Sequence, residues 1–539
     1  MSGNGTRDSR ARRIRLPPSC RHVAPTLVAV LPVLAFGCLA IAGVRRNTML
    51  GGDQAVLELW SRSAAHGKAL LGPYSRFGWN HPGPALFYWF APFYLVTGQR
   101  PEGLGIASLL LVVGGLGYVS VLVGRVVGRA GAWTAAAVAL AFVLATGTDW
   151  FDETWNPVVI VAPMIVLGVA CAGVVAGRRW CLVAAVACAT FSIQTHVGTL
   201  PVAFVWSAIA TVACGVRLYR SREGWLGPIV SAVVVGVGLW LPPLYEQVTR
   251  TPGNLRLLAR SNIRNAGAHH SLRDVYDTTA AQFTLSGRGL MGQVLGRLGT
   301  TPVGAGPLRL VWLIVLVTAA IASAVRAFRT GRPFEAALSG GGVVAALVLM
   351  ISLTRVQGAL LGYLTLSAIA VGFVMYLGIA LTVVGELRRV RTPRLNRVVA
   401  SLVTVAGVAL AFVALTRTPS DAVYSRHVSA AGAPQTLESL RARLPPGHGG
   451  VDIVIDEQKL WPVASLVANQ LERSGFRTAE TPDWLYMFGR QRSIDGCESA
   501  RVHVSLPTDP IDAAMEVVGQ IDLGQIRVQQ LDPPPRCRR

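Results

Sequence analysis

A single carboxylate marks the edge of the first long apolar run of this chain. Asp53 follows Gly51-Gly52, and the run QAVLELW after it has the composition of a helix. A carboxylate in such a position can act as a general base that takes a proton from an incoming hydroxyl group. Aspartate is also favoured as the N-cap of a helix, so the sequence leaves a structural role open beside the chemical one.

A second acidic segment, DWFDETWNP, lies between two later apolar runs. It holds three carboxylates, Asp149, Asp152 and Glu153, among Trp and Phe residues. Aromatic rings offer flat apolar surfaces on which sugars stack, and carboxylates accept hydrogen bonds from hydroxyl groups. The segment is therefore a candidate carbohydrate site. An aromatic belt at a membrane interface with a solvated loop has the same composition and is the alternative.

Two histidines stand beside apolar segments. His81 precedes a Pro-Gly-Pro corner (82–84), and His196 ends an apolar run in which Gln194 and Thr195 are also polar. Polar groups at membrane depth are costly and usually face a cavity, which favours a binding role for His196. A structural role at the end of a membrane span is the alternative, and the residue types do not decide between the two.

Residues that could bind substrate or phosphate also fall in two later places. The segment 245–306 is long for a connection and contains Glu246, Asn254, Arg256 and further arginines. Long loops are often functional, and Arg binds phosphate with a fixed geometry. We predict that Glu246 and Asn254 contact substrate and that Arg256 contacts phosphate. Arg355, at the end of another apolar run, is a second phosphate candidate, and snorkelling to the membrane surface is its alternative role.

Membrane-spanning helices must position most of these residues. The chain has 539 residues, of which 52% are hydrophobic and 14% charged, whereas soluble proteins are about 25% charged. A span needs about 20 apolar residues, and by that rule we predict about eleven spans. They lie near 23–43, 103–124, 131–148, 157–176, 180–196, 199–215, 226–245, 307–326, 335–353, 359–384 and 397–416.

The net charge of +22 comes mostly from arginines in short loops between these runs. Such loops mark the cytoplasmic side of a membrane protein, and no nucleic-acid recognition motif accompanies the charge. The basic loops share one side only if the segment 81–97 does not cross the membrane. Its prolines and aromatic residues favour a helix in the outer interface, with a short true span as the alternative. We thus predict a cytoplasmic N-terminus (1–22), a first outer loop (46–102) and a large outer loop (246–306).

The composition changes after the predicted transmembrane domain (23–418). Fifteen of the twenty-eight acidic residues fall in 419–539. The segments 451–456 and 500–506 alternate as strands do, and 461–475 has helical spacing that ends at a glycine. We predict a small α/β domain, placed outside the cell because the number of spans is odd.

Several common chemistries have no support in the sequence. It contains no CxxC pair, no P-loop, GxSxG or HExxH motif, and no GxGxxG at a strand–helix corner, so no metal or other cofactor is predicted. The cytoplasmic loops are too short for a nucleotide-binding domain, so energy must come from an activated lipid donor or an ion gradient. Cys497 and Cys537 could form a disulfide outside the cell or remain free thiols.

This combination of residues resembles the GT-C superfamily of polyprenyl-phosphate-sugar glycosyltransferases, especially the branch of the protein O-mannosyltransferases and aminoarabinose lipid A transferases. Members carry an acidic residue soon after the first span, here Asp53, and a His/Lys-Pro-Pro corner before an aromatic helix, here HPGPALFYWFAPFYLVTG. Their next span ends in basic residues, here Arg125 and Arg129, and a second acidic loop follows. The motifs match over about residues 23–215, whereas residues 216–418 resemble the family in architecture only. The corner is Pro-Gly-Pro here, and Gln follows Asp53 where the mannosyltransferases have Glu.

The resemblance implies an inverting glycosyltransferase of the plasma membrane. It would move a sugar from a polyprenyl-phosphate donor to a glycan, glycolipid or protein acceptor on the outer face. Asp53 would be the general base, the acids of 149–153 and His196 would orient the sugar and the acceptor, and Arg355 with the arginines of 250–264 would hold the phosphate. Two other classes stay open: a transporter or flippase of a lipid-linked sugar, and a non-catalytic envelope-assembly protein. The lack of charges deep in the spans and of an internal repeat disfavours the transporter.

Overall fold

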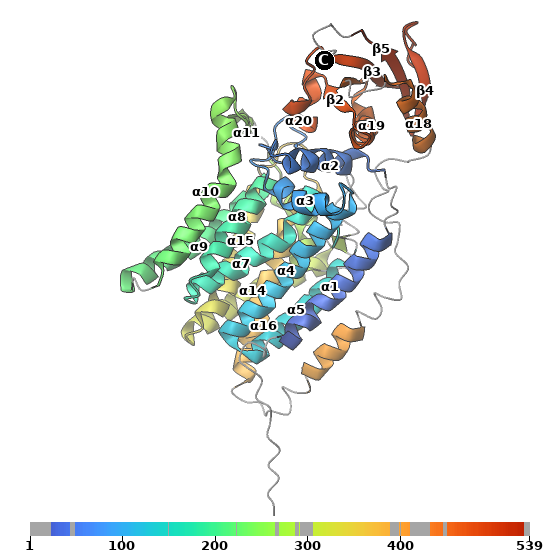
Figure 1. Ribbon diagram of the computed structural model, residues 1–539. Helices are drawn as coiled ribbons and strands as arrows, with labels where there is room; N and C mark the ends of the chain where they lie inside the picture. Colours follow the sequence, from blue (N-terminus) through green and yellow to red (C-terminus); the bar gives the residue numbers. More distant parts are fainter. Residues whose placement is uncertain are drawn as a thin grey trace, which may run out of the picture.

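The computed structural model is a helical bundle with a small sheet domain at one end (Figure 1). The sheet domain lies at the upper right of Figure 1, and the helices of the bundle run below it. The residues that the structure describes are 23–43, 49–148, 150–221, 224–264, 269–285, 290–291, 306–388, 398, 400–409, 432–445 and 450–532. The predicted N-terminal segment 1–22 and the predicted domain boundary near 419 lie outside these residues.

Within the described part of the chain, nine helices are long and apolar enough to cross a membrane. They are α1 (Val23–Gly43), α4 (Glu102–Val127), α5 (Arg129–Thr146), the pair α6 and α7 (Asn156–Val159 and Val161–Val175), α9 (Leu200–Arg220), α10 (Leu226–Thr249), α14 (Pro307–Arg329), α15 (Pro333–Leu353) and α16 (Ser367–Leu387). These helices confirm the expected all-α membrane domain.

The predicted count of about eleven spans is not confirmed. Two of the predicted spans coincide with shorter apolar helices, α8 (Cys181–Thr195) and a helix at 400–409. At 1.5 Å per residue, the 15 residues of α8 extend only about 22 Å, less than the ~30 Å of a bilayer core. Even so, α8 packs inside the bundle against α7 and α10.

The helix α10 continues past two consecutive prolines and past its predicted end at 245. It includes Pro242 and Pro243 and ends at Thr249. Pro243 has no N–H and therefore leaves the Leu239 carbonyl without its helical partner. The Gln194 side chain of α8 donates to that carbonyl oxygen over 2.8 Å. A neighbouring side chain thus replaces the missing hydrogen bond, which is how membrane helices tolerate proline.

Basic residues from several loops gather at the end of the bundle away from the sheet domain. The Arg178 guanidinium donates to the Arg125 carbonyl oxygen over 2.6 Å, and Arg388 donates to that of Val127 over 3.1 Å. The sequence analysis placed these loops on one side of the membrane, and the contacts agree with it. That this side is the cytoplasmic one remains a prediction from the positive charge.

Two helices of the first predicted outer loop lie between the bundle and the sheet domain (Figure 1). They are α2 (Gly52–Ala65) and α3 (Ala85–Val96). The 12 residues of α3 extend about 18 Å, too short to cross a bilayer. The aromatic segment 81–97 is therefore a short helix beside the bundle end, as the charge distribution required.

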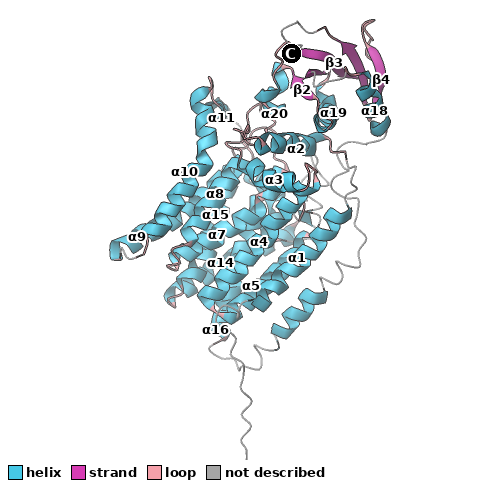
Figure 2. Cartoon of the chain, in the orientation of Figure 1, coloured by secondary structure: helices cyan, strands magenta, loops and turns pink. Residues whose placement is uncertain are grey.

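The C-terminal domain is a five-stranded mixed sheet with helices beside it (Figure 2). The strand order is β2-β1-β3-β5-β4, with β1 parallel to β2 and β3, and β5 antiparallel to β3 and β4. The strands are β1 (Gly450–Ile455), β2 (Arg477–Glu480), β3 (Glu498–Ser505), β4 (Glu516–Ile521) and β5 (Gly524–Gln530). The helices α18 (Ala433–Arg443) and α19 (Trp461–Arg473) pack on it.

The small α/β domain is thus as predicted, including its first strand, its helix and its third strand. The shorter β2 and the hairpin of β4 and β5 carry no clear alternation, and the sequence did not predict them. Cys497, before β3, is disulfide-bonded, and its partner lies outside the described residues.

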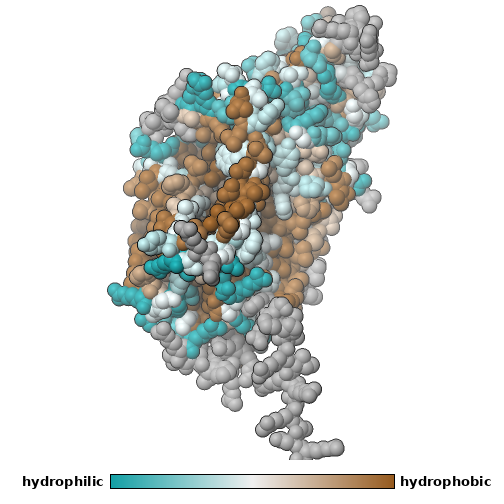
Figure 3. All heavy atoms as spheres, turned by 60° about the vertical axis from the view of Figure 1, so that its left-hand side comes forward, coloured by the Kyte–Doolittle hydropathy of each residue, from teal (hydrophilic) through white to brown (hydrophobic). Residues whose placement is uncertain are grey.

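The surface of the molecule carries the hydropathy pattern of a membrane protein. Figure 3 shows hydrophobic side chains gathered in the middle of the molecule, with hydrophilic regions toward the C-terminal domain and toward the other end. The helix α10 contributes to it through exposed Val230, Val234 and Leu241. In water such a surface would be costly, so it faces lipid.

Candidate active site

The Asp53 carboxylate lies in the first turn of α2. The helix begins at Gly52 and its N-cap is Gly51, so the N-cap role that the sequence left open for Asp53 is wrong. Tyr74 donates its hydroxyl hydrogen to Asp53 Oδ1. The first turn of a helix also carries a partial positive charge that favours a carboxylate. Asp53 is half-buried, so its carboxylate is held in place but not sealed off.

Tyr74 links Asp53 to the C-terminal domain. Its ring lies edge-on to those of Trp461 and Tyr486, with centroids 6.0 and 6.2 Å away. Burial and the charge of Asp53 hold the pKa of Tyr74 well above its usual value. The phenol is therefore neutral and remains a hydrogen-bond donor to the carboxylate at any physiological pH.

An exposed cation follows Tyr74 by two residues on the same loop. Arg76 is exposed, and its guanidinium donates to the carbonyl oxygens of Gln357 and Ala359 over 2.9 and 2.8 Å. The Tyr363 hydroxyl group lies within electrostatic range of both Arg76 and Asp53. The sequence analysis singled out neither Arg76 nor Tyr363.

The second acidic segment meets the same end of α2. Glu153 Oε1 accepts hydrogen bonds from the N–H groups of Thr154 (2.9 Å) and Trp155 (3.0 Å), and from Gln54 Nε2 at 3.4 Å. Asp152 and Glu153 are both buried. Burial, with a smaller contribution from Asp152, raises the pKa of Glu153 to about 7 against the opposing hydrogen bonds. Since Gln54 follows Asp53, the two predicted acidic groups are brought together.

The aromatic residues of this segment have different roles from those expected. Trp150 and Phe151 are buried in the core, and Trp150 Nε1 donates to Thr146 Oγ1 over 3.2 Å. These two rings are therefore not available to stack on a sugar. Trp155 is only half-buried and lies 4.8 Å from the Tyr363 ring between centroids. Asp149 lies outside the described residues.

The two predicted histidines form a buried pair. The rings of His81 and His196 are 4.9 Å apart between centroids, and the Val197 N–H donates to His81 Nδ1 over 3.1 Å. Burial lowers the pKa of His196 to about 4, and burial together with His196 holds the pKa of His81 well below its usual value. Both imidazoles are neutral at pH 7, so they can exchange hydrogen bonds with hydroxyl groups but cannot supply a positive charge.

Gly83 explains the Pro-Gly-Pro corner. A Cβ atom at this position would lie 2.2 Å from Gln194 Oε1. At Gly72, on the same loop, a Cβ atom would lie 2.6 Å from the Gln194 carbonyl oxygen. The loop can therefore pack against the end of α8 only without side chains at these positions. This close approach brings His81 to His196.

Glu246 and Asn254, predicted to bind substrate, meet beside the same loop. Glu246 Oε2 accepts a hydrogen bond from the Asn254 N–H over 2.9 Å. The Asn254 side chain accepts from the Asn80 N–H (2.9 Å) and donates to the Asn80 carbonyl oxygen (2.7 Å). Asn80 also donates to the Tyr486 carbonyl oxygen over 2.8 Å. The bundle, the first loop and the C-terminal domain therefore converge here.

Two predicted phosphate contacts are not brought into this cluster. Arg256 is exposed on α11 (Asn254–Arg264), and Arg355 is exposed just beyond the end of α15. For both residues the structure gives only backbone hydrogen bonds, from Arg256 N to Gln247 Oε1 and from Arg355 N to the Ser352 carbonyl oxygen. Their roles in phosphate binding remain predictions.

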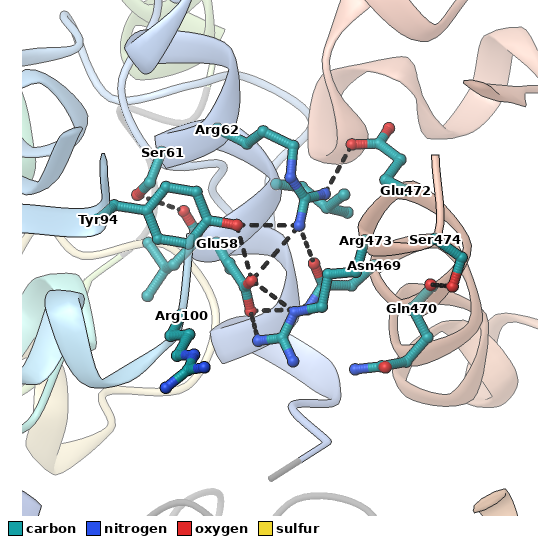
Figure 4. A network of polar contacts seen from close by, with 12 residues as sticks. Glu58, Ser61, Arg62, Tyr94, Arg100, Asn469, Gln470, Glu472, Arg473 and Ser474 are labelled. Atoms are coloured by element: carbon teal, nitrogen blue, oxygen red, sulfur yellow. Dashed lines mark hydrogen bonds and ion pairs between the residues drawn. The ribbon is translucent and has the colours of Figure 1, made fainter. Parts of the chain in front are cut away.

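The opposite side of α2 is held by a buried network of charges (Figure 4). Glu58 is fully buried and accepts hydrogen bonds from Arg473 (2.8 and 2.7 Å), Asn469 (2.8 Å) and Tyr94 (2.9 Å). Arg62 lies 3.4 Å from Glu58 and donates to Glu472 of α19 over 2.9 Å. The network joins α2 to α3 on one side and to α19 on the other, so it fixes the helix that carries Asp53.

No family model and no curated protein matches this sequence. Solved structures of similar fold include the following two. Both are crystal structures of ArnT from Cupriavidus metallidurans, one bound to undecaprenyl phosphate and one in the apo state. The TM-scores are 0.56 and 0.53, each at 15% identity, and both alignments cover 93% of this chain and 97% of the other. The likeness confirms the predicted fold over nearly the whole chain, including the C-terminal domain.

Proposed function

We propose that this protein is a membrane glycosyltransferase that uses a polyprenyl-phosphate-linked sugar, with Asp53 as its general base. The observation that carries the proposal is the placement of Asp53. It is a half-buried carboxylate at the end of a membrane bundle, held by Tyr74, and the exposed cation Arg76 follows Tyr74 by two residues on the same loop. One structure of similar fold, ArnT, was crystallised with undecaprenyl phosphate, which supports a donor of this kind.

The reaction follows from these groups. Asp53 takes the proton of an acceptor hydroxyl group, and the oxygen attacks the anomeric carbon of the donor sugar. A new carbon–oxygen bond forms as the bond to the donor phosphate breaks, so polyprenyl phosphate leaves and the anomeric configuration inverts. We assign the stabilisation of the negative charge on the leaving phosphate to Arg76, with Arg355 and Arg256 as further candidates on the exposed surface.

The buried polar groups around Asp53 suit the binding of sugar hydroxyl groups. Asp152 and Glu153 offer carboxyl oxygens, and the neutral imidazole of His196 offers either a donor or an acceptor. The half-buried Trp155 and Tyr363 rings give an apolar surface beside them. We propose that acceptor and donor meet on the face that carries the C-terminal domain, outside the cell.

The test is the substitution Asp53→Asn in the full-length protein. Loss of a general base typically slows a reaction by roughly 10²- to 10⁴-fold. We expect a strain that carries only this variant to accumulate a polyprenyl-phosphate sugar, as a deletion strain does, and to lose sugar from its envelope. The matched control is Asp277→Asn, which changes a partly exposed acid on α12 (Leu272–Thr284) and should restore the wild-type lipid profile.

Normal sugar transfer by Asp53→Asn at a normal protein level would sink the proposal. The same variant separates the two other classes. A flippase that does not need this base would still move the lipid-linked sugar across the membrane. An assembly protein would show no change in its lipid-linked sugars in either the variant or the deletion strain.

A further inference from the structure

A cavity of about 580 Å³ lies where three parts of the chain meet. Its walls come from the loop of Asn80, from the turn between α10 and α11 and from residues 482–493 of the C-terminal domain. Pockets of about 300 to 1,000 Å³ hold small ligands of drug size. Nothing in the proposed transfer step uses this cavity, so its lining needs a separate explanation.

One of the residues that line the cavity, Glu246, has a buried carboxylate oxygen without a hydrogen-bond partner. Glu246 is buried, with 3% of its surface exposed, and its Oε2 accepts from Asn254. Its other oxygen, Oε1, is also buried and has no hydrogen-bond partner. A buried oxygen of this kind costs free energy unless a bound group donates to it. A hydroxyl group of a sugar is such a donor.

Two arginines from different parts of the chain line the same cavity. Arg250 follows the end of α10, and Arg490 belongs to the C-terminal domain. Both are exposed. Like charges repel, so two guanidinium groups that line one cavity are best compensated by an anion between them. The cavity therefore combines a site for a hydroxyl group with a site for a negative charge.

Two aromatic residues, Tyr486 and Tyr74, connect the cavity to Asp53. Tyr486 lines the cavity, and its ring lies 6.2 Å from that of Tyr74, which binds Asp53. The wall that Arg490 provides belongs to the C-terminal domain, beyond the end of the bundle (Figure 1). A donor phosphate must stay near the membrane because its lipid chain is buried there. The cavity is better placed for a molecule that arrives from the aqueous side.

We propose that this cavity binds a sugar that carries a negative charge, a phosphate or a carboxylate, and that this sugar is part of the acceptor. Glu246 accepts a hydrogen bond from its hydroxyl group, and Arg250 and Arg490 pair with its charge. The word acceptor rests on the proposed glycosyltransferase function, whereas the binding of an anionic sugar does not.

The test is ligand binding to the purified full-length protein, with glucose 6-phosphate, glucuronate and neutral glucose as probes. Calorimetry or saturation-transfer NMR should show that both anionic sugars bind at least about tenfold more tightly than glucose. The double substitution Arg250→Gln and Arg490→Gln should remove that preference. Arg273→Gln, an exposed arginine of α12 that does not line the cavity, is the matched control and should bind as wild type does.

A second arm uses undecaprenyl phosphate as the probe. Its affinity should be equal in the wild type and the double variant. If the double variant loses its affinity for undecaprenyl phosphate, the cavity holds the phosphate of the lipid donor and the proposal is wrong. Equal binding of charged and neutral sugars by the wild type would also overturn it. Glu246→Gln should weaken the binding of all three sugars. The arginine variants change exposed residues, so they test the proposal even if Glu246→Gln does not fold.

These results are separable from those for the proposed function. Asp53→Asn should bind the anionic sugars as the wild type does, because Tyr74 separates Asp53 from the cavity. If the binding pattern holds but no sugar transfer is found, only the glycosyltransferase proposal fails. If transfer is found but charge-dependent binding is not, only the cavity proposal fails.

Discussion

At the scale of single residues, the proposed role of Asp53 as a base depends on its hydrogen bond from Tyr74. The phenol is buried between the C-terminal domain and the first loop and stays neutral. It can therefore orient the carboxylate without competing with it for the proton of a substrate. A general base works only when it lies within hydrogen-bond reach of the proton it removes.

Tyr74→Phe should slow sugar transfer by roughly tenfold, because a carboxylate without its donor is less well oriented. The donor KM should change little, since Tyr74 is not proposed to contact the lipid phosphate. Steady-state transfer kinetics measure both quantities. Tyr276→Phe is the control, since it also removes one hydrogen bond of a tyrosine, to the Gly306 carbonyl oxygen at 3.2 Å. Equal rates in wild type and Tyr74→Phe would contradict the orienting role.

Glu153 should give the protein a pH-dependent stability near neutrality. Burial, and to a smaller extent the charge of Asp152, raises the pKa of Glu153 from 4.5 to about 7. The folded chain therefore keeps a proton that the unfolded chain releases. Its contribution to stability is fully present below about pH 4.5 and is lost as the pH rises toward 7. The loss is at most about 3 kcal/mol.

Glu153→Gln should remove this dependence, because an amide does not titrate in this range. Thermal unfolding of the purified protein between about pH 5 and pH 8 measures it. We expect the variant to gain melting temperature relative to the wild type as the pH rises. A difference that stays constant over this range would show that Glu153 does not titrate there.

At the scale of elements, α2 is the piece on which the site depends. One end of it carries Asp53 and Gln54, and its middle carries the buried Glu58 and Arg62. In the same network, Arg492 and Arg62 lower the pKa of Glu472 to about 2 although burial opposes them. Buried charges in such a network are stable only while all their partners are present.

Glu58→Gln should strongly destabilise the docking of the C-terminal domain on α2. It removes the negative charge that faces Arg62 and Arg473, and removal of one member of a buried ion pair costs about 3 to 5 kcal/mol. Limited proteolysis and thermal unfolding should both show an earlier release of this domain. Glu516→Gln is the control, because its ion pair with Arg443 is exposed and such pairs contribute about 0 to 1 kcal/mol. Similar effects of the two substitutions would show that the network does not hold the domain.

Sequence periodicity predicted elements better than it predicted their partners. The apolar runs identified most membrane helices, and alternation identified β1 and β3, because both signals report which face of an element is buried. Neither signal tells which other element covers that face. The hydrogen bond from Trp60 Nε1 to the Met487 carbonyl oxygen, over 2.7 Å, joins residues 427 positions apart. No local pattern encodes such a contact.

In the candidate site, too, the sequence predicted single residues better than it predicted their partners. Asp53, Glu153, His81 and His196 were predicted from residue type beside apolar runs, and the structure places them on one end of the bundle. Tyr74 was missed, since one tyrosine among eleven carries no mark of the carboxylate it will reach. Of the two arginines of the cavity wall, Arg250 lies in the segment 250–264 that was predicted to hold phosphate, whereas Arg490 was equally hard to distinguish in a chain with many arginines.

At the scale of the whole molecule, the basic loops and the C-terminal domain lie at opposite ends. The charge rule then predicts that the domain is outside the cell. A cysteine introduced at exposed Asp512 of this domain should react with a membrane-impermeant thiol reagent on intact cells. A cysteine at exposed Arg329, at the basic end of α14, should react only after the cells are opened. The reverse pattern would invert the topology and move the proposed reaction to the cytoplasm.

The packing of α2 against the C-terminal domain also determines when α2 can become ordered during synthesis of the chain. Glu58 leaves the ribosome early, but its partner Arg473 follows 415 residues later. At about 5 to 20 residues per second, roughly 20 to 80 s pass between them. During that interval the charges of α2 have no partner from α19, and the helix that carries Asp53 cannot adopt its final position. A chain cut short anywhere before α19 would therefore insert its membrane helices without the partners that fix α2, and under the proposed function we expect it to transfer no sugar.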